Sequence, residues 1–360
     1  MIDRMKDMSA AVLEAPHQLR VRKVPVPVLE QGEVLCKVAA CGICGSDLRY
    51  LAGENPWAKH TLGHETPNPP NMILGHEVSG VVEISGRSVR AGLLAFRTCG
   101  ECEECVRGQS QLCRRTEHLG HGAGWEGREF NPGGMAEFMP VWQENVYALP
   151  ENVSFNQAIF LDGLGVAIHA VRRAEIDDDD RVAVLGAGPI GLLIAQAARV
   201  WGAGTVVATD VYDAALECAL DVGLHAAVDG RGSEAGEAIS ELAQTAGGET
   251  LHVIFDSTGD LAMQQAAINA LAPGGMLMLM AGAAEGLCLD PSSLAGERRI
   301  TTSSNNLPED FARGVELLAS GQIVVEPMIT HEFPLSDAVK AFEVAEQKHS
   351  TGAIKVIIHP

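Results

Sequence analysis

The sequence predicts an α/β protein with a β-rich first part and a later part built on a doubly wound parallel sheet. Three observations lead to this prediction. Short apolar runs separated by Gly and Pro fill roughly the first 160 residues. From residue 182 onwards, apolar strand patterns alternate with helical patterns over short connections. A glycine-rich turn joins the first of these strands to the first helix.

The elements follow from these patterns. In the first part, strands are expected at residues 34–39, 78–84 and 135–141, and a loop rich in Pro, His and Asn at 55–70. In the second part, strands are expected at 182–185, 205–209, 253–256, 275–281 and 300–303, and helices at 189–200, 213–220 and 261–271. Near the C-terminus, a helix at 308–320 is expected to end at Gly321, and a helix at 335–347 to have Ser336 as its N-cap.

The composition argues against two classes of partner. The chain has 26 Lys and Arg against 47 Asp and Glu, a formal charge of −21, whereas nucleic acids and anionic membrane surfaces attract basic proteins. No segment reaches the roughly 18 consecutive apolar residues of a membrane span. Residues 1–9 are charged and contain no apolar signal segment, so we expect a cytoplasmic protein, with Met8 as an alternative start.

The glycine-rich turn runs Gly186-Ala-Gly188-Pro189-Ile190-Gly191, directly between an expected strand and an expected helix. In this context the GxGxxG pattern predicts a dinucleotide site. Gly186 permits the tight turn, Gly188 lets the backbone approach the pyrophosphate, and Gly191 lets helix and strand pack closely. The helix N-terminus then offers free N–H groups and a positive partial charge to the phosphates.

Two other features belong to this nucleotide site. Asp210 ends the next strand, about 20 residues on, where a carboxylate accepts hydrogen bonds from ribose hydroxyls and repels a 2′-phosphate. Residues 211–213 contain no Arg or Lys, so NAD is predicted rather than NADP; the alternative is a turn Asp that caps the following helix. The backbone of Met280, Ala281 and Gly282 ends a later strand, where the nicotinamide is expected, although Met280 also continues an alternating Met pattern typical of a core strand.

A cysteine cluster indicates metal binding. Seven of the nine Cys fall between residues 36 and 113, a clustering that in a reducing compartment favours metal over disulfides. Cys99, Cys102, Cys105 and Cys113 form a C-x2-C-x2-C-x7-C spacing. Four thiolates this close can complete a tetrahedral zinc site, which leaves no position for substrate, so a structural zinc is predicted. Disulfides and free thiols are the alternatives.

These motifs, with Cys41-Gly-Ile-Cys44-Gly-Ser-Asp47 and Gly75-His76-Glu77, make nearly the whole chain similar to the zinc-containing medium-chain alcohol and polyol dehydrogenases. The CGSD motif and an acidic third ligand position resemble the sorbitol and threonine dehydrogenase branches. The resemblance implies a GroES-like catalytic domain formed by residues 1–162 and 307–360, with a Rossmann domain, 163–306, inserted between them. It also implies a homo-oligomer, either a dimer or a tetramer.

The resemblance assigns the ligands of a catalytic zinc. Cys44 is implied as the thiolate ligand and His76 as the imidazole ligand, and such a site keeps an open position for an alcohol. His64 lies in a second Gly-His-Glu string, but no strand follows it, whereas apolar residues 78–82 follow His76 and can hold it rigidly. His60 and His64 are candidates for the substrate entrance.

Two carboxylates are candidates for the remaining position. Glu77 either binds zinc or lies just behind it. Asp162 falls where polyol dehydrogenases carry an acidic residue. Because Asp is shorter than the more usual Glu, it binds directly or through a water, or it is instead the N-cap of the following helix.

The resemblance also implies residues that handle the proton. Ser46 matches a proton-relay hydroxyl, and Asp47 would orient His76 through its second ring nitrogen. Where many members have a relay His, this chain has Arg49, which does not exchange a proton near neutral pH. The proton is then expected to leave through Glu77 or water, with Arg49 as a solvated surface residue in the simplest interpretation.

Three other histidines are expected to be structural. His169 is expected to pack on a helix, and His118 and His121 to shape the surface of the Gly-rich loop that ends at Gly134.

The sequence therefore predicts zinc- and NAD-dependent interconversion of a secondary alcohol and its ketone, with a polyol, sugar or cyclitol as the first substrate class. An amino alcohol such as threonine is the second and a short-chain diol the third. A non-catalytic NAD-binding sensor is a different class of function, against which the intact Cys44, His76 and Glu77 argue.

Overall fold

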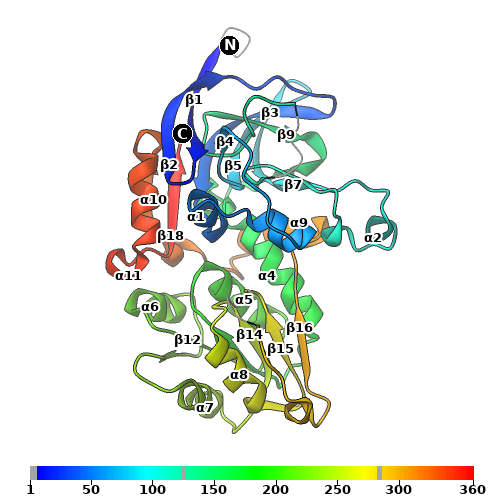
Figure 1. Cartoon of the computed structure of the whole chain (residues 1–360), viewed down its shortest axis with the longest axis vertical. Coiled ribbons are helices and arrows are strands. Elements are labelled where there is room, and N and C mark those ends of the chain that lie inside the picture. Colours follow the sequence, from blue (N-terminus) through cyan, green and yellow to red (C-terminus); the bar gives the residue numbers. More distant parts are fainter. Residues whose placement is uncertain (1–5, 123–126, 282–285) are drawn as a thin grey trace. The chain divides into compact units, whose positions relative to one another are not determined.

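The computed structural model describes residues 6–122, 127–281 and 286–360, with strands and helices labelled in Figure 1. The chain divides into two compact units. Unit 1 comprises Met1–Asp162, Leu307–Ala319 and Ile329–Pro360, and unit 2 comprises Gly163–Asn306 and Ser320–Met328. Residues 320–328, expected in the catalytic domain, therefore cluster with unit 2.

Unit 1 is mainly antiparallel β-structure. Its strands are β1 (Asp7–Ala15), β2 (Gln18–Pro25), β3 (Glu33–Gly42), β4 (Met72–Ile73), β5 (Glu77–Ile84), β6 (Arg87–Leu93), β7 (Phe96–Arg97), β8 (Glu117–His118), β9 (Phe138–Trp142), β10 (Val146–Ala148), β17 (Ile329–Pro334) and β18 (Lys355–His359). They form a sheet β2-β1-β4, a sheet β10-β6-β5-β3-β18-β17 with β9 also paired to β3, and the pair β7-β8. The last strand of the chain, β18, thus pairs with β3 from the first 50 residues.

Helices of unit 1 are short or cover the sheets. They are α1 (Gly45–Leu51), the π-helix η2 (Ala58–Leu62), α2 (Glu103–Val106), α3 (Phe155–Ala158), α9 (Pro308–Ala319), α10 (Ala338–Glu346) and α11 (Lys348–Thr351). Single turns of 3-10 helix lie at Ser110–Leu112, Gln143–Asn145 and Leu335–Asp337. One core cluster joins β3, β5 and β9 with α10 through buried Val38, Val78, Met139 and Phe342.

Unit 2 is built on one six-stranded parallel sheet. Its strands are β11 (Arg181–Leu185), β12 (Thr205–Asp210), β13 (Ala226–Asp229), β14 (Leu251–Asp256), β15 (Leu271–Leu279) and β16 (Arg299–Thr302), in the order β13-β12-β11-β14-β15-β16. This is the strand order of doubly wound dinucleotide-binding sheets. The side chains of Val182, Ala183 and Val184 are all buried, so both faces of the central strand are covered.

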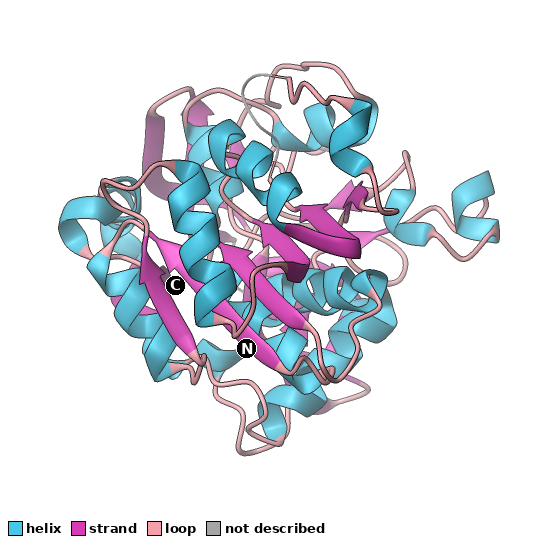
Figure 2. Ribbon diagram, turned by 90° about the horizontal axis from the view of Figure 1, so that it is seen from below, coloured by secondary structure: helices cyan, strands magenta, loops and turns pink. Residues whose placement is uncertain are grey.

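The helices that cover this sheet are α4 (Leu161–Ala174), α5 (Pro189–Val200), α6 (Asp213–Asp221), α7 (Ala235–Thr245) and α8 (Leu261–Ala270), with 3-10 turns at Pro291–Leu294 and Glu326–Met328. The boundary between the units falls inside α4. Figure 2 shows helices in cyan packed on the strands in magenta. The expected elements of this part are present, but β13 and α7 were not predicted because their apolar patterns are short and interrupted by polar residues.

Two local expectations, and the alternative interpretation of Asp162 as an N-cap, were wrong. The loop expected at 55–70 contains the π-helix η2. Helix α10 begins only at Ala338 with Asp337 as its N-cap, so Ser336 lies in the preceding 3-10 turn. Asp162 is in the first turn of α4 rather than at its N-cap, because the helix already begins at Leu161.

Among the residues that the structure describes, no helix has both the length and the apolar character to cross a membrane.

One buried side chain of unit 1 allows a stability prediction. The Asn145 amide is 7% exposed and donates hydrogen bonds to the carbonyl oxygens of Leu94, at 3.0 Å, and Phe96, at 2.6 Å. Asn145→Ala leaves both carbonyls without this donor, so the free energy of unfolding should fall by about 1–3 kcal/mol. Asn152→Ala, at an exposed Asn with one hydrogen bond, should change it by less than about 0.5 kcal/mol. Equal urea midpoints for the two variants would contradict the prediction.

Candidate active site and metal centres

Unit 1 brings the expected ligands of the open zinc site together. Cys44 precedes α1, His76 directly precedes β5, Glu77 is the first residue of β5, and Asp162 lies in the first turn of α4. The Cys44 sulfur, a ring nitrogen of His76 and a carboxylate oxygen of Glu77 all lie within 4.8 Å of one another. The Asp162 Oδ2 atom is 4.0 Å from His76 Nε2. The segments of Cys44 and of His76 and Glu77 therefore present three donor atoms to one point, and Asp162, about 120 residues after Cys44 in the sequence, lies beside His76.

Asp47 fixes the relative position of two of these segments. Its carboxylate is fully buried and accepts the backbone N–H of Cys44 at 2.9 Å and that of Gly75 at 3.2 Å. Its expected hydrogen bond to His76 is not formed, because the Oδ1–Nδ1 distance is 3.9 Å. Asp47 thus aligns the two ligands mainly through the backbone next to each.

Gly75 is required for the approach of His76 to the site. Its φ is +95°, a conformation that favours glycine, and an added Cβ would collide with the Cys41 sulfur. Cys41 itself is buried in the core and belongs to no metal-ligand group of the described residues. The Gly-His-Glu motif therefore has a local steric reason as well as a chemical one.

Several acidic groups gather around the imidazole of His76 in this site. Burial raises the pKa of Asp162 to about 6 and also raises that of Asp47. Burial works against a protonated His76, but Cys44, Asp47 and Asp162 raise its pKa to about 10. Anionic donors of mixed sulfur, nitrogen and oxygen type around one imidazole are the donor set that zinc prefers. The chemistry of the residues therefore fits a bound divalent cation.

Lys355, on β18, was not predicted and supplies a positive charge that contacts these donors. Its ammonium group is 2.8 Å and 2.6 Å from the two oxygens of Glu77 and 3.3 Å from the carbonyl oxygen of Ile43. It also lies over the Phe160 ring, 5.7 Å from the centroid. A Lys that opens an otherwise apolar strand was the only sequence signal. Lys355 thus contacts the ligand segments of Cys44 and Glu77 and the segment just before Asp162.

His118 and His121 correct the expectation that they shape the surface. Their rings lie 5.6 Å and 4.2 Å from the His76 ring and 4.0 Å from each other. His121 Nδ1 is 3.0 Å from the Tyr50 hydroxyl. Burial lowers the pKa of His118 to about 3 and that of His121 well below its ordinary value, so both are neutral at physiological pH. His118 ends β8, where it pairs in register with Phe96 of β7.

The remaining expected residues have different surroundings. The Ser46 hydroxyl oxygen is buried and has no hydrogen-bond partner within the described part of the chain. Arg49 pairs with Glu54, Nη2 to Oε2 at 2.8 Å, and its side chain is 37% exposed, which agrees with the surface interpretation. His64 is exposed and contacts Thr66, and it belongs to neither group of metal-ligand atoms found among the described residues. The side chain of His60 lies outside the described structure, and His169 is buried on α4.

The second metal site is the four-cysteine loop around α2. The Sγ atoms of Cys99, Cys102, Cys105 and Cys113 lie within 4.8 Å of one another, with separations of 3.5 Å, 3.8 Å and 4.0 Å for three of the pairs. A tetrahedral site with metal–sulfur bonds of about 2.3 Å has sulfur–sulfur edges of about 3.8 Å. A disulfide would need about 2.05 Å, and all nine cysteines are free. The geometry fits a closed zinc site.

In unit 2, the glycine-rich turn has the geometry of a phosphate-binding loop. Gly186 has φ +92°, Gly188 is the N-cap of α5 and has open space around it, and a Cβ on Gly191 would collide with the Gly186 carbonyl oxygen. Pro189 and Ile190 form the first turn of α5. The free N–H groups of this turn therefore face an open position.

Asp210 and the end of β15 complete the nucleotide features. Asp210 Oδ2 accepts the Ala187 N–H at 2.7 Å, and Oδ1 accepts the N–H groups of Val211 and Tyr212. It therefore also forms a turn, as the alternative interpretation proposed, although the N-cap of α6 is Tyr212. Met280 and Ala281 follow β15, and both donate to the Asp256 carbonyl oxygen. Gly282 lies outside the described residues.

Lys355 provides a prediction about stability. Lys355→Met leaves the Glu77 carboxylate buried without its cation, so the free energy of unfolding should fall by about 3–5 kcal/mol. The double variant Lys355→Met with Glu77→Gln removes both charges and should recover most of this loss. Urea denaturation measures all three proteins. A single variant as stable as the unaltered chain would contradict the prediction.

The stability contributed by the Lys355–Glu77 ion pair also has a defined pH dependence. Burial alone lowers the pKa of Lys355, but Glu77 and the other anionic neighbours raise it above the ordinary 10.5. A raised folded pKa means that the stabilisation is complete below about pH 10.5 and is lost only as the pH rises through the folded value. Between pH 6 and 9, the difference in stability between Lys355→Met and the unaltered chain should therefore not change through titration of this lysine.

Known protein families match the sequence of both units. Residues 30–151 match the alcohol dehydrogenase GroES-like domain, and residues 189–320 match the zinc-binding dehydrogenase domain. A sorbitol dehydrogenase of Bombyx mori is 30% identical over 365 residues, which cover 99% of each chain. An L-threonine 3-dehydrogenase of Coxiella burnetii (strain RSA 493) is 30% identical over 335 residues, 91% of this chain and 92% of the relative.

Solved structures show the same similarity. A short chain alcohol dehydrogenase from Escherichia coli CFT073, complexed with NADH, has a TM-score of 0.85 and 27% identity and covers 99% of this chain and 100% of its own. A protein from Sinorhizobium meliloti 1021 bound to NADP has a TM-score of 0.86 and 28% identity with the same coverage. The chain therefore belongs to the family of zinc-binding medium-chain alcohol and polyol dehydrogenases.

Proposed function

We propose that this chain uses zinc and NAD to interconvert a secondary alcohol, of the polyol, sugar or cyclitol class, and its ketone. The observation that carries the proposal is the convergence of Cys44, His76 and two carboxylates in one unit of a chain whose other unit has a dinucleotide-binding loop. The relative named sorbitol dehydrogenase supports the substrate class. The relative named L-threonine 3-dehydrogenase, equally identical, supports an amino alcohol as the second candidate.

The chain's residues have separable roles in this reaction. Cys44, His76 and Asp162 would hold the metal, while the two bonds from Lys355 keep Glu77 behind it. Bound zinc would lower the pKa of the substrate hydroxyl, and NAD⁺ would accept the hydride. The partnerless hydroxyl oxygen of Ser46 would take up the alcohol proton. Because Arg49 is engaged by Glu54, the onward transfer of the proton would use another acceptor.

The nucleotide loop would bind the cofactor independently of the metal. The first turn of α5 would donate N–H groups to the pyrophosphate, and the Asp210 carboxylate would face the adenosine ribose. The Cys99, Cys102, Cys105 and Cys113 site would hold a second zinc that stabilises its loop. We further propose a cytoplasmic location, supported by nine free thiols, and a homo-oligomer, supported by the family resemblance.

Turnover tests the catalytic assignment. Cys44→Ala should lower kcat with a polyol by at least about 100-fold, because the site loses a ligand and zinc no longer activates the hydroxyl. NADH binding, measured by fluorescence, should remain within about two-fold of the unaltered chain, because Cys44 belongs to the other unit. His64→Ala, in the second Gly-His-Glu string, is the matched control and should keep its activity. A Cys44→Ala variant with full activity would show that Cys44 is not a ligand of a catalytic zinc.

A substrate panel separates the classes of function. NADH formation should be faster with sorbitol, xylitol or a cyclitol than with threonine or 2,3-butanediol. A reversed order would move the chain to the amino-alcohol or diol class. No turnover with any alcohol, together with intact NADH binding, would support the non-catalytic sensor.

Metal analysis tests both sites at once. The purified chain should contain about two zinc ions. Cys102→Ser should lose one of them and destabilise the loop, and His76→Ala should lose the other with the four-cysteine site still occupied. Retention of both ions in either variant would show that the altered residue is not a required ligand.

A further inference from the structure

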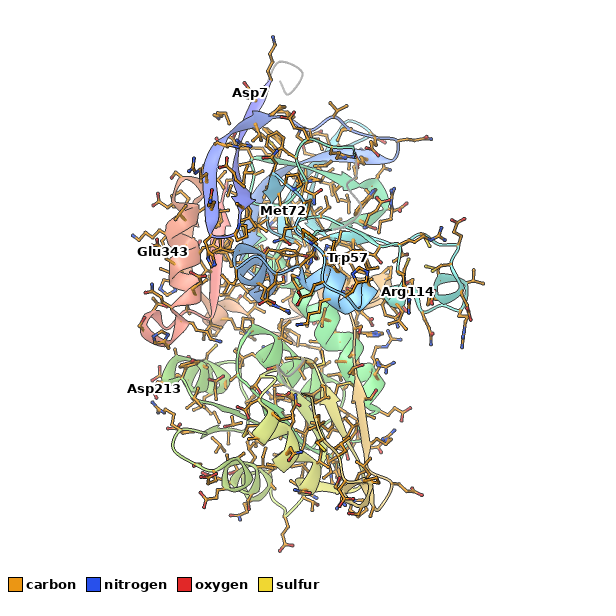
Figure 3. The ribbon with its side chains drawn as sticks, in the orientation of Figure 1. Asp7, Trp57, Met72, Arg114, Asp213 and Glu343 are labelled. Carbon is orange, nitrogen blue, oxygen red and sulfur yellow. The ribbon has the colours of Figure 1, made fainter. Side chains whose placement is uncertain are left out.

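An ion-pair cluster lies where β12 and β13 end in unit 2. The Arg231 guanidinium Nη2 atom is 2.6 Å from Asp213 Oδ1 and 2.7 Å from Asp229 Oδ2, and Nε is 2.9 Å from Asp229 Oδ1. Asp213 is the first residue of α6 and is labelled in Figure 3. The Arg231 side chain is 49% exposed, so it is accessible to a solute.

The cluster is next to the carboxylate proposed to face the adenosine ribose. Asp210 and Asp229 pair in register as neighbours on adjacent parallel strands. The Gly230 N–H donates to the Asp210 carbonyl oxygen at 3.0 Å, which brings the following Arg231 beside the end of β12. Asp213 comes three residues after Asp210. The sequence showed no basic residue in 211–213, but the fold supplies one from the next strand.

A guanidinium at this place has a known chemical use. In dinucleotide-binding sheets, an Arg near the ribose carboxylate accommodates the 2′-phosphate of NADP. Arg binds phosphate through several parallel N–H bonds and retains its charge at all physiological pH values. Here Asp213 and Asp229 already occupy the Nε and Nη2 donors. Hydrogen bonds from Arg231 lower the pKa of Asp229 to about 2, so this acid remains ionised.

We propose that Asp213 and Asp229 determine the preference for NAD over NADP by occupying Arg231, which would otherwise bind the 2′-phosphate. Asp210 repels the phosphate, and the other two acids engage Arg231, a nearby group that could attract it. The inference rests on the proposed nucleotide site at the Gly186–Gly191 turn. It does not depend on the metal or on the substrate.

Nucleotide binding without substrate tests the proposal. The double variant Asp213→Asn with Asp229→Asn keeps the shape of both side chains and removes their charges. Its Kd for NADPH, measured by fluorescence titration of the holoenzyme, should fall by at least about ten-fold, the effect of one hydrogen bond to a charged group. Adding Arg231→Ala should abolish the gain. A gain in affinity cannot arise from misfolding, so the readout is independent of any loss of stability.

Charge-matched variants separate this effect from general electrostatics. Glu217→Gln with Asp221→Asn removes two negative charges from exposed positions further along α6. This control should change the Kd for NADPH by less than about two-fold, because screened surface charges act weakly over distance. An equal gain in the control, or a gain that persists without Arg231, would overturn the proposal. If the unaltered chain binds neither NADH nor NADPH, the proposed nucleotide site is wrong and the inference fails with it. If the unaltered chain binds NADH but the double variant gains no affinity for NADPH, the inference about Arg231 fails and the proposed function survives.

Discussion

The candidate active site depends on the balance of buried charge around His76. A thiol and three carboxyl groups, from Cys44, Asp47, Glu77 and Asp162, surround one imidazole in a region from which water is largely excluded. Taking so many acidic groups out of water is costly unless cations or hydrogen bonds compensate them. Lys355 neutralises Glu77, and backbone N–H groups satisfy Asp47. The Cys44 sulfur and an Asp162 oxygen remain beside His76 as donor atoms that suit a divalent ion.

The two candidate metal sites differ in how many chain segments supply their donors, as expected for one structural and one catalytic site. The four sulfur donors of residues 99–113 all come from one short segment and lie close enough together for a closed tetrahedral site. The site of Cys44 and His76 takes its donors from three segments that the sheet of unit 1 brings together. Neutral His118 and His121 pack against one side of it, which lowers the local polarity without adding charge. A site assembled in this way can leave one direction open to a substrate.

The sequence predicted those features that are encoded locally. Helix α5 has the expected bounds, and Gly186 and Gly191 have the expected steric roles, because strand, turn and helix follow each other directly. Cys44 and His76 could be placed only through resemblance to a family, since nothing local indicates that they converge. Lys355 and Arg231 could not be predicted, because their partners depend on strand pairing between distant segments. His118 and His121 were placed on the surface because a Gly-rich segment gives no sign of the direction in which it folds.

The position of Lys355 in the last strand has a consequence for biosynthesis. Its partner Glu77 is 278 residues earlier in the chain, and β18 joins the sheet beside β3. During synthesis, the first part of the chain leaves the ribosome long before this strand, at about 5–20 residues per second. For that interval Glu77 lacks its counter-ion and β3 lacks its neighbour β18. The nascent chain thus exposes an unpaired strand edge and an uncompensated acidic group until β18 has been synthesised.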